Sequence, residues 1–561
     1  MPELIHNLQG KDLGHLRIIA ELWGLEFSAP DAHIGLQRLM PLLLDAENLE
    51  EVLSSLPAEA AKALHELMRR QGRIPWMLFT RRYGVVREIG PGKRDREHPY
   101  LNENASASEA LWYRGLIGRG FFESSAGPEE FAYIPEDLLP FMPIVESPAT
   151  PTLGRPASQS EKSRTLPIND RLLDDVCTML AGLRMNMQPA EIEGHLRCGK
   201  NTPYPLTSEA LLSLLKIAGY LDAFNQPNPE PVRLLLESGP GQALANLFEA
   251  WLRSVEFNEL KLVPGLAIEG HWKNNPLQAR QSVIDFISTI PDSLQANDVE
   301  NKRPYWSLGA FVSAVYQANP DFQRPAGDYD SWYVREVDDG KFLRGFEHWH
   351  EVDGVFLKFM IGGPLHWLGI FDLAMPENEQ IISAFRFSDW ADDLLNFKAP
   401  TGLKEEEQSV TVRADGRLRM PPQTSRVGRY QLARFCEWQE FNDGFYRYRI
   451  TPASLEAARK QGLKVDHLLV LLNRFAQATP PSLVTALKRW ESHGSLVRID
   501  RLVVLRFKQP EALAALRASS AQRFLGESLG PTAVVIKPGG WEKVSMVLAE
   551  LGYLAETHLN E

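Results

Sequence analysis

The stretch Phe445–Gly462 reads FYRYRITPASLEAARKQG and contains two different periodic patterns. In its first half, tyrosines and an isoleucine alternate with Arg447 and Arg449, which is the two-residue period of a half-buried strand. Thr451 and the proline after it then predict a helix start, because threonine is a favoured N-cap and proline fits the first helical position. Gly462 supplies a stop for that helix. The stretch therefore predicts a strand that passes directly into a capped helix.

The sequence around this stretch continues the mixture of strands and helices. The segment SVTVRADGRLRMPP at 409–422 predicts two short strands joined by an Asp-Gly turn. Leucine-rich segments at 466–476 and 480–494 have the three-to-four spacing of amphipathic helices. Strand-like and helix-like segments then alternate to the end of the chain. Residues 408–561 therefore predict a mixed α/β module.

Four segments of this module resemble one known family. VTVRADGRLRMPP, YRYRITPASLEAARKQGL, LNRFAQATPPSLVTALKRW and RLVVLRF are similar to the helicase-associated domain that precedes the motor in XPB-type DNA helicases. Related domains occur in stand-alone bacterial proteins without a motor. The most specific part is the run Tyr-x-Tyr-x-Ile-Thr-Pro-x-Ser-Leu-x-x-Ala. The resemblance implies a role in DNA transactions, in which such a domain engages distorted DNA or positions the motor.

The first 407 residues are predominantly helical in pattern. Three helix-like segments followed by a strand, between residues 57 and 134, have the order of a winged-helix unit. A Pro-, Ser- and Thr-rich stretch with few bulky apolar residues predicts a linker. We expect a predominantly helical, multidomain α+β chain. The predicted parts are a helical and winged-helix-like domain at 1–145, the linker at 146–165, a helical domain at 166–300, a second winged-helix-like domain at 301–407 and the helicase-associated domain at 408–561.

The charge is distributed unevenly along the chain. The 561 residues carry a net charge of −12, which argues against simple coating of nucleic acid. Residues 408–561, however, carry 22 basic and 14 acidic residues, while the first 407 carry 38 basic and 58 acidic ones. This asymmetry indicates that one part contacts a polyanion while another is solvated or contacts a protein. The alternative is simple variation between domains.

Composition also bears on the class and compartment of the protein. Hydrophobic residues make up 44% and charged residues 24%, as in ordinary globular proteins. No stretch approaches the roughly 18 to 20 apolar residues of a membrane span. The N-terminus has no signal-peptide layout, and three widely spaced cysteines exclude a disulfide framework or a cysteine-rich zinc module. We expect a cytoplasmic protein.

The sequence contains no recognisable motor or catalytic motif. The phosphate-binding loop Gly-x-x-x-x-Gly-Lys-Ser/Thr is absent, and GPGKRDRE at 90–97 has the wrong spacing. His348 and His350 could contribute to a metal site, but no further ligand can be identified beside them. We therefore expect no enzyme activity, no cofactor and no metal.

Basic residues are the strongest site candidates, because lysine and arginine contacts to phosphate provide salt-sensitive affinity. In the winged-helix interpretation, Arg114 and Arg119 lie on the third helix, which usually reads the groove. Arg447 and Arg449 should project from one strand face as a phosphate-binding stripe. The alternative for each set is a solvated surface with internal ion pairs. The candidate DNA-binding residues are Arg81, Arg82, Lys93, Arg94, Arg96, Arg114, Arg119, Arg426, Arg429, Arg447, Arg449, Lys488 and Arg489.

These observations support three hypotheses. The first is a non-catalytic accessory protein that binds duplex or forked DNA and acts with a separately encoded helicase or nuclease in DNA repair or transcription. The second is a protein-interaction scaffold whose winged-helix units do not bind DNA directly. The third is a metal-dependent nuclease that uses His348 and His350, for which the sequence offers the least support.

Overall fold

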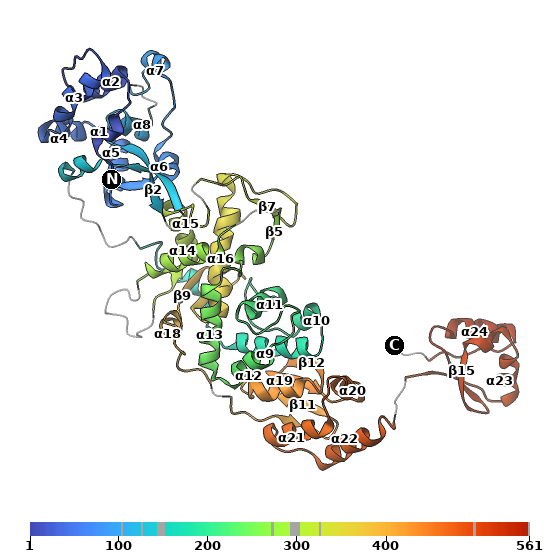
Figure 1. The fold of residues 1–561 in the computed structure, drawn as a ribbon. Helices are drawn as coiled ribbons and strands as arrows, with labels where there is room; N and C mark the ends of the chain where they lie inside the picture. Colours follow the sequence, from blue (N-terminus) through green and yellow to red (C-terminus); the bar gives the residue numbers. More distant parts are fainter. Residues whose placement is uncertain are drawn as a thin grey trace. The chain divides into compact units, whose positions relative to one another are not determined.

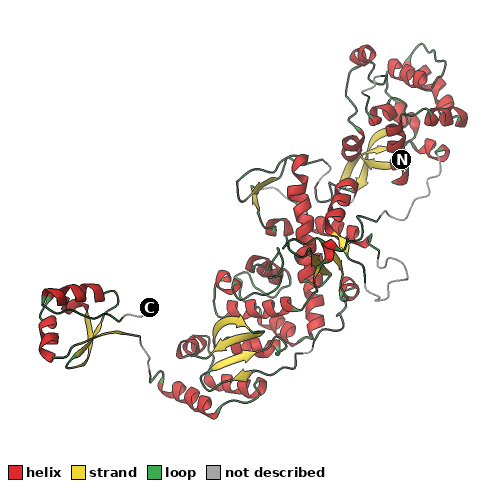
Figure 2. Cartoon of the chain, turned by 180° about the vertical axis from the view of Figure 1, so that it is seen from behind, coloured by secondary structure: helices red, strands yellow, loops and turns green. Residues whose placement is uncertain are grey.

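The computed structural model describes most of the chain. The described residues are 1–101, 105–124, 127–142, 152–270, 274–291, 303–324, 327–404, 406–497 and 501–558. They form two compact units, Met1–Pro480 and Pro481–Glu561, and mix many helices with small antiparallel sheets (Figures 1 and 2). This confirms the predicted α+β class. The five predicted domain ranges stay predictions, and the predicted linker lies outside the described residues up to residue 151.

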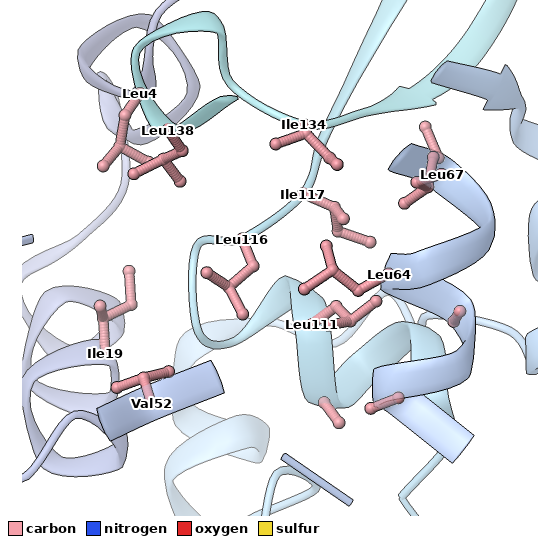
Figure 3. Packing of buried hydrophobic residues seen from close by; sticks show 14 of the residues in the cluster. Leu4, Ile19, Val52, Leu64, Leu67, Leu111, Leu116, Ile117, Ile134 and Leu138 are labelled. Atoms are coloured by element: carbon pink, nitrogen blue, oxygen red, sulfur yellow. The ribbon is translucent and has the colours of Figure 1, made fainter. Parts of the chain in front are cut away.

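The first part of the larger unit is a helical layer with a three-stranded sheet of order β1-β3-β2. Its elements are α1 (Leu4–Leu8), α2 (Leu13–Leu22), α3 (Ala32–Leu43), α4 (Ala46–Ser54), α5 (Ala58–Arg69), β1 (Arg73–Pro75), α6 (Trp76–Tyr83), α7 (Pro91–Glu97), α8 (Ala107–Trp112), β2 (Gly118–Ser124), β3 (Gly127–Tyr133) and η1 (Glu136–Phe141). Leu64, Leu111 and Ile117 meet in its core (Figure 3). Helices and strands occur in the expected order, while the winged-helix assignment stays a prediction.

The middle of the larger unit is mainly helical and contains the four-stranded sheet β4-β8-β9-β6 and the β5-β7 pair. Its elements are η2 (Ser160–Lys162), β4 (Arg164–Leu166), α9 (Arg171–Arg184), α10 (Pro189–Glu193), α11 (Ser208–Ile217), α12 (Pro229–Glu237), α13 (Pro240–Arg253), η3 (Glu259–Leu262), β5 (Leu266–Glu269), α14 (Pro276–Ser288), β6 (Trp306–Ser307), α15 (Leu308–Ala318), β7 (Tyr333–Glu336), η4 (Phe346–His348), η5 (His350–Gly354), α16 (Val355–Gly362), α17 (Pro364–Trp367), β8 (Phe371–Met375), β9 (Ala384–Phe387) and α18 (Ala391–Leu395).

The last part of the larger unit is an antiparallel sheet of order β10-β11-β13-β12 with three helices. Helix α19 packs against α9 and α12 and so connects this last part to the helical middle of the unit (Figure 1). The elements are β10 (Thr411–Val412), β11 (Arg417–Met420), α19 (Arg426–Ala433), β12 (Glu437–Asn442), β13 (Phe445–Arg449), α20 (Pro452–Lys460) and α21 (Val465–Phe475).

The smaller unit has its own apolar core, in which Leu516, Val534 and Val544 are fully buried. Its sheet has the order β14-β16-β15. The elements are α22 (Pro481–His493), β14 (Val503–Arg506), α23 (Pro510–Arg517), η6 (Ser520–Phe524), β15 (Leu525–Gly530), β16 (Ala533–Ile536) and α24 (Trp541–Glu550). Among the helices of the described residues, none has both the length and the apolar character that crossing a membrane requires.

A buried ion pair joins α19 to α9. The Arg429 guanidinium is 1% exposed, and its Nη2 lies 3.1 Å from Asp174 Oδ1. Arg429 also donates hydrogen bonds to the Asp174 carbonyl oxygen at 2.5 Å and to Thr178 Oγ1 at 3.3 Å. Burial raises the pKa of Asp174, and the Arg429 guanidinium opposes this shift by favouring the carboxylate. Because both charged groups are almost completely buried, with side chains 1% and 10% exposed, each depends on the other.

We expect Arg429→Met to reduce the free energy of unfolding by about 3 to 5 kcal/mol, because it leaves the Asp174 carboxylate buried without a cation. The double variant Asp174→Leu/Arg429→Met should recover most of this loss. Chemical denaturation of the full chain measures both effects. Arg474→Met, at an exposed position of α21, is the control. A single and a double variant of equal stability would contradict this role of the pair.

Candidate nucleic-acid interface

The end of β13 is fixed by the cap that the sequence predicted. Thr451 Oγ1 accepts a hydrogen bond from the Ser454 backbone N–H at 3.1 Å, and Ser454 Oγ accepts one from the Thr451 N–H at 2.9 Å. The proline that follows Thr451 begins α20, and Gly462 has a φ of +78° just beyond the end of this helix. The predicted strand, cap and stop are therefore confirmed.

The sheet places four arginines on one outward face. In the antiparallel register, Arg417 of β11 lies opposite Arg449 of β13, and Arg419 lies opposite Arg447. Successive residues of a strand point to opposite faces, so these four share one side. The residues between them form the buried side, on which Leu418, Met420, Tyr446 and Tyr448 are at most 7% exposed. We call the set Arg417, Arg419, Arg447 and Arg449 the arginine face.

The arginine face is only partly neutralised. Arg447 pairs with Asp443 at 2.6 Å, and Arg417 lies 3.5 Å from Asp415. The Arg419 guanidinium lies 4.2 Å from the centre of the Phe445 ring. Within the described residues, no ion pair joins Arg419 or Arg449 to a carboxylate. On its other side Arg449 lies opposite Glu437 of β12, without an ion pair between them among the described residues. Because like charges directly opposite each other destabilise a sheet, the two opposed arginine pairs still suit an external anion.

The sequence prediction included Arg447 and Arg449 but missed their partners Arg417 and Arg419. The run RLRM at 417–420 carries the same two-residue alternation as FYRYR, so the signal was present. What the sequence did not contain was the pairing of β11 with β13, which brings the two runs into register.

Two other candidate DNA-binding residues of this region are buried and form internal ion pairs. Arg429 forms the pair with Asp174 described above. Arg426 is 4% exposed, pairs with Glu406 and donates a hydrogen bond to the Ser238 carbonyl oxygen at 2.6 Å. A phosphate contact by either side chain would require these internal contacts to open. In the smaller unit, Lys488 and Arg489 are both exposed on α22.

The structure corrects the placement of two N-terminal candidates. Helix α8 ends at Trp112, so neither Arg114 nor Arg119 lies on the third helix. Gly115, with a φ of +70°, turns the chain directly after α8. Arg114 donates a hydrogen bond back to the Ala110 carbonyl oxygen, and Arg119 lies on β2. The Arg119 guanidinium lies between Glu88 at 3.0 Å and Glu130 at 2.7 Å.

The remaining N-terminal candidates differ in their surroundings. Arg81 pairs with Asp321 at 3.3 Å and lies 4.0 Å from the centre of the Phe346 ring. Half-exposed Arg82 lies 3.7 Å from Glu66, and exposed Lys93 lies 3.7 Å from Glu97. Arg96 is exposed, whereas Arg94 is 5% exposed and pairs with Asp12 at 2.7 Å and Asp95 at 2.8 Å. These side chains do not form one uniform cationic surface.

The histidines considered for metal binding lie in short helical turns rather than on a strand. His348 is in η4 and lies 4.0 Å from Glu351, while the His350 ring packs against Tyr316. Among the described residues, no group of three or more potential metal ligands comes together. Asp353, which is close in sequence, is buried and pairs with Arg324 at 2.8 Å.

Comparisons with known proteins connect the arginine face to helicases. Residues 410–529 match a family described as the helicase conserved C-terminal domain, and this range contains β10 to β13 completely. A DNA 3'-5' helicase XPB from Kineococcus radiotolerans is 28% identical over 155 residues. That match covers 26% of this chain and 28% of the relative, so the chain spans less than a third of the relative's length. The chain is helicase-related over this part.

His15, which lies near Arg94, should make the stability of this region depend on pH. Burial, with Lys11 and Arg94 nearby, lowers the pKa of the His15 side chain to about 4. The backbone N–H of His15 donates a hydrogen bond to Asp12 Oδ1, the carboxylate that Arg94 pairs with. A histidine that is held neutral in the folded state contributes full stability above its unfolded pKa of about 6.5. This contribution is lost as the pH falls from about 6.5 to 4. The hydrogen-exchange protection factors of α2, which correct for the slower intrinsic exchange at lower pH, should therefore fall across this window in the wild type and much less in His15→Phe. An equal fall in both proteins would contradict the prediction.

Proposed function

We propose that this chain is a non-catalytic accessory protein that binds DNA through the arginine face and acts with a separately encoded helicase or nuclease. One observation carries the proposal: two rows of opposed arginines lie on the outward face of a sheet inside the helicase-matching region. The likeness to a DNA helicase supports DNA as the polyanion. The absence of a phosphate-binding loop from the sequence supports a role without a motor.

The dimensions of the sheet suit a phosphate backbone. Arginines on one face of a strand are separated by about 7 Å along the strand, and opposed residues are about 5 Å apart across the sheet. Long guanidinium side chains at these positions can contact two to four phosphates, each through paired N–H donors. No base-reading pattern accompanies them, so we expect binding with little sequence preference. In the smaller unit, Lys488 and Arg489 are exposed on α22 and are separate candidates for phosphate contact.

Fluorescence anisotropy of the full chain with duplex, single-stranded and forked DNA tests this function. We expect binding at low salt that weakens steeply as salt is added, because phosphate contacts release counterions. Charge reversal in Arg417→Glu/Arg449→Glu should reduce affinity strongly. It should also lower the salt slope by about 0.9 for each lost duplex phosphate contact.

Matched controls separate a local contact from a change in total charge. Arg171→Glu/Arg253→Glu alters the net charge equally at exposed positions of α9 and α13 and should bind DNA like the wild type. Melting temperatures of all variants verify folding. Absence of DNA binding at low salt would refute the proposal and favour the scaffold hypothesis. In that case, a protein partner that survives nuclease treatment should be found.

A further inference from the structure

The buried arginines among the described residues pair with carboxylates, with one exception. Among the described residues, six arginines are less than 9% exposed. Five of them form an ion pair with a carboxylate: Arg94 with Asp12, Arg280 with Glu259, Arg324 with Asp353, Arg426 with Glu406 and Arg429 with Asp174. The sixth, Arg434, lies directly after α19 and is 8% exposed.

Arg434 contacts neutral groups where the other five contact acids. Its Nη1 donates to Gln431 Oε1 at 3.0 Å, and its Nε and Nη2 both lie 3.4 Å from Gln461 Oε1. Amide oxygens orient a guanidinium but do not neutralise it, and a buried charge without a counter-charge is costly. Burial lowers the pKa of Arg434, and the nearby Arg184 lowers it further. Within the described residues, the Arg434 guanidinium therefore has amide partners and no carboxylate partner.

A groove of about 310 Å³ lies beside this guanidinium. Residues of α12 and α19, two helices that pack against each other (Figure 1), contribute to its lining. Arg184, exposed at the end of α9, also lines it, and within the described residues no ion pair joins Arg184 to a carboxylate. The one acid in the lining, Glu237, is bound by Arg233 at 2.8 Å. Two unneutralised guanidinium groups therefore face the groove.

Apart from Arg233 and Gln431, which also line the groove, the rest of the lining is apolar or aromatic. Pro227, Pro229, Val232 and Val427 contribute apolar surface, and Tyr430 contributes a ring that is 7% exposed. A volume of about 310 Å³ lies at the lower end of the range for small-molecule sites, about 300 to 1,000 Å³. Cationic groups beside an apolar lining fit a ligand with a phosphate group and a planar, weakly polar body.

We propose that this groove binds one nucleotide unit, with the phosphate between Arg184 and Arg434 and the base against the prolines and Tyr430. The unit is either a free nucleoside monophosphate or one nucleotide of a DNA strand. Both offer the same phosphate ester, and guanidinium groups bind it through paired hydrogen bonds. The inference does not rest on the arginine face, because its residues lie on or next to α9, α12 and α19.

Isothermal calorimetry of the full chain with deoxyadenosine monophosphate, with deoxyadenosine and with a ten-residue deoxyadenosine oligonucleotide tests the site. We expect the monophosphate to bind and deoxyadenosine to bind at least tenfold more weakly. Arg184→Ala should weaken monophosphate binding about tenfold or more, since it removes a charge-assisted contact. Arg171→Ala, at an exposed position of the same helix, should leave it unchanged.

The oligonucleotide distinguishes the two sources of the phosphate. It is titrated into Arg417→Glu/Arg449→Glu protein, in which the arginine face is disabled. If Arg184→Ala weakens oligonucleotide binding there while the monophosphate alone does not bind, the ligand is a strand. If neither ligand responds to Arg184→Ala, the inference is wrong, whether or not the arginine face binds DNA.

A second variant tests, without any ligand, whether the buried Arg434 guanidinium lacks a counter-charge in the folded protein. Arg434→Met removes a buried cation that has no counter-charge, so the melting temperature should stay equal or rise. Arg429→Met removes a paired cation from the same helix and should lower it. A loss of stability in Arg434→Met as large as that in Arg429→Met would show a structural role for Arg434 and overturn the inference.

Discussion

The ion pair between Arg429 and Asp174 holds the helicase-related sheet and its helix α19 against the helical middle of the larger unit. It joins two residues that are 255 positions apart in sequence and draws α19 onto α9. The buried face of the sheet follows α19 into this contact, since the Tyr446 ring lies 4.2 Å from the Arg429 guanidinium. One face of the sheet is thereby used for packing. The opposite face, with its rows of arginines, is left available for a ligand.

The parts of the fold that depend on neighbouring residues could be predicted from sequence. The alternation in β13 requires only that one face be buried, and the cap of α20 is completed between Thr451 and Ser454, three positions apart. The glycine stop is equally local, because Gly462 adopts a positive φ that other residues rarely adopt. For the same reason the α+β class could be derived from the mixture of periods.

Other features depend on residues distant in sequence and could not be predicted in this way. Arg429 and Arg449 look alike in the sequence, yet one is buried against Asp174 and the other is exposed. The alternation of β13 predicts an outward Arg449, but the burial of Arg429 depends on a carboxylate 255 positions away in sequence. The same holds for Arg417 and Arg419, whose importance follows from their register with β13. The end of α8 at Trp112 was also missed, because the apolar residues after it continue the helical pattern into a strand.

The arginines of this protein occur in three physical settings, which differ in how available each guanidinium is to an anionic ligand. Arginines buried with carboxylates stabilise packing and are unavailable to ligands. Opposed, exposed arginines on β11 and β13 repel one another at modest cost, because water and salt screen them. Arg434 has no carboxylate partner among the described residues and is only 8% exposed, so water screens its charge less than it screens the exposed arginines. The more completely a cation is removed from water without a counter-charge, the more free energy an incoming phosphate can recover. The groove beside Arg434 should therefore hold its anion more tightly for each contact than the exposed face does.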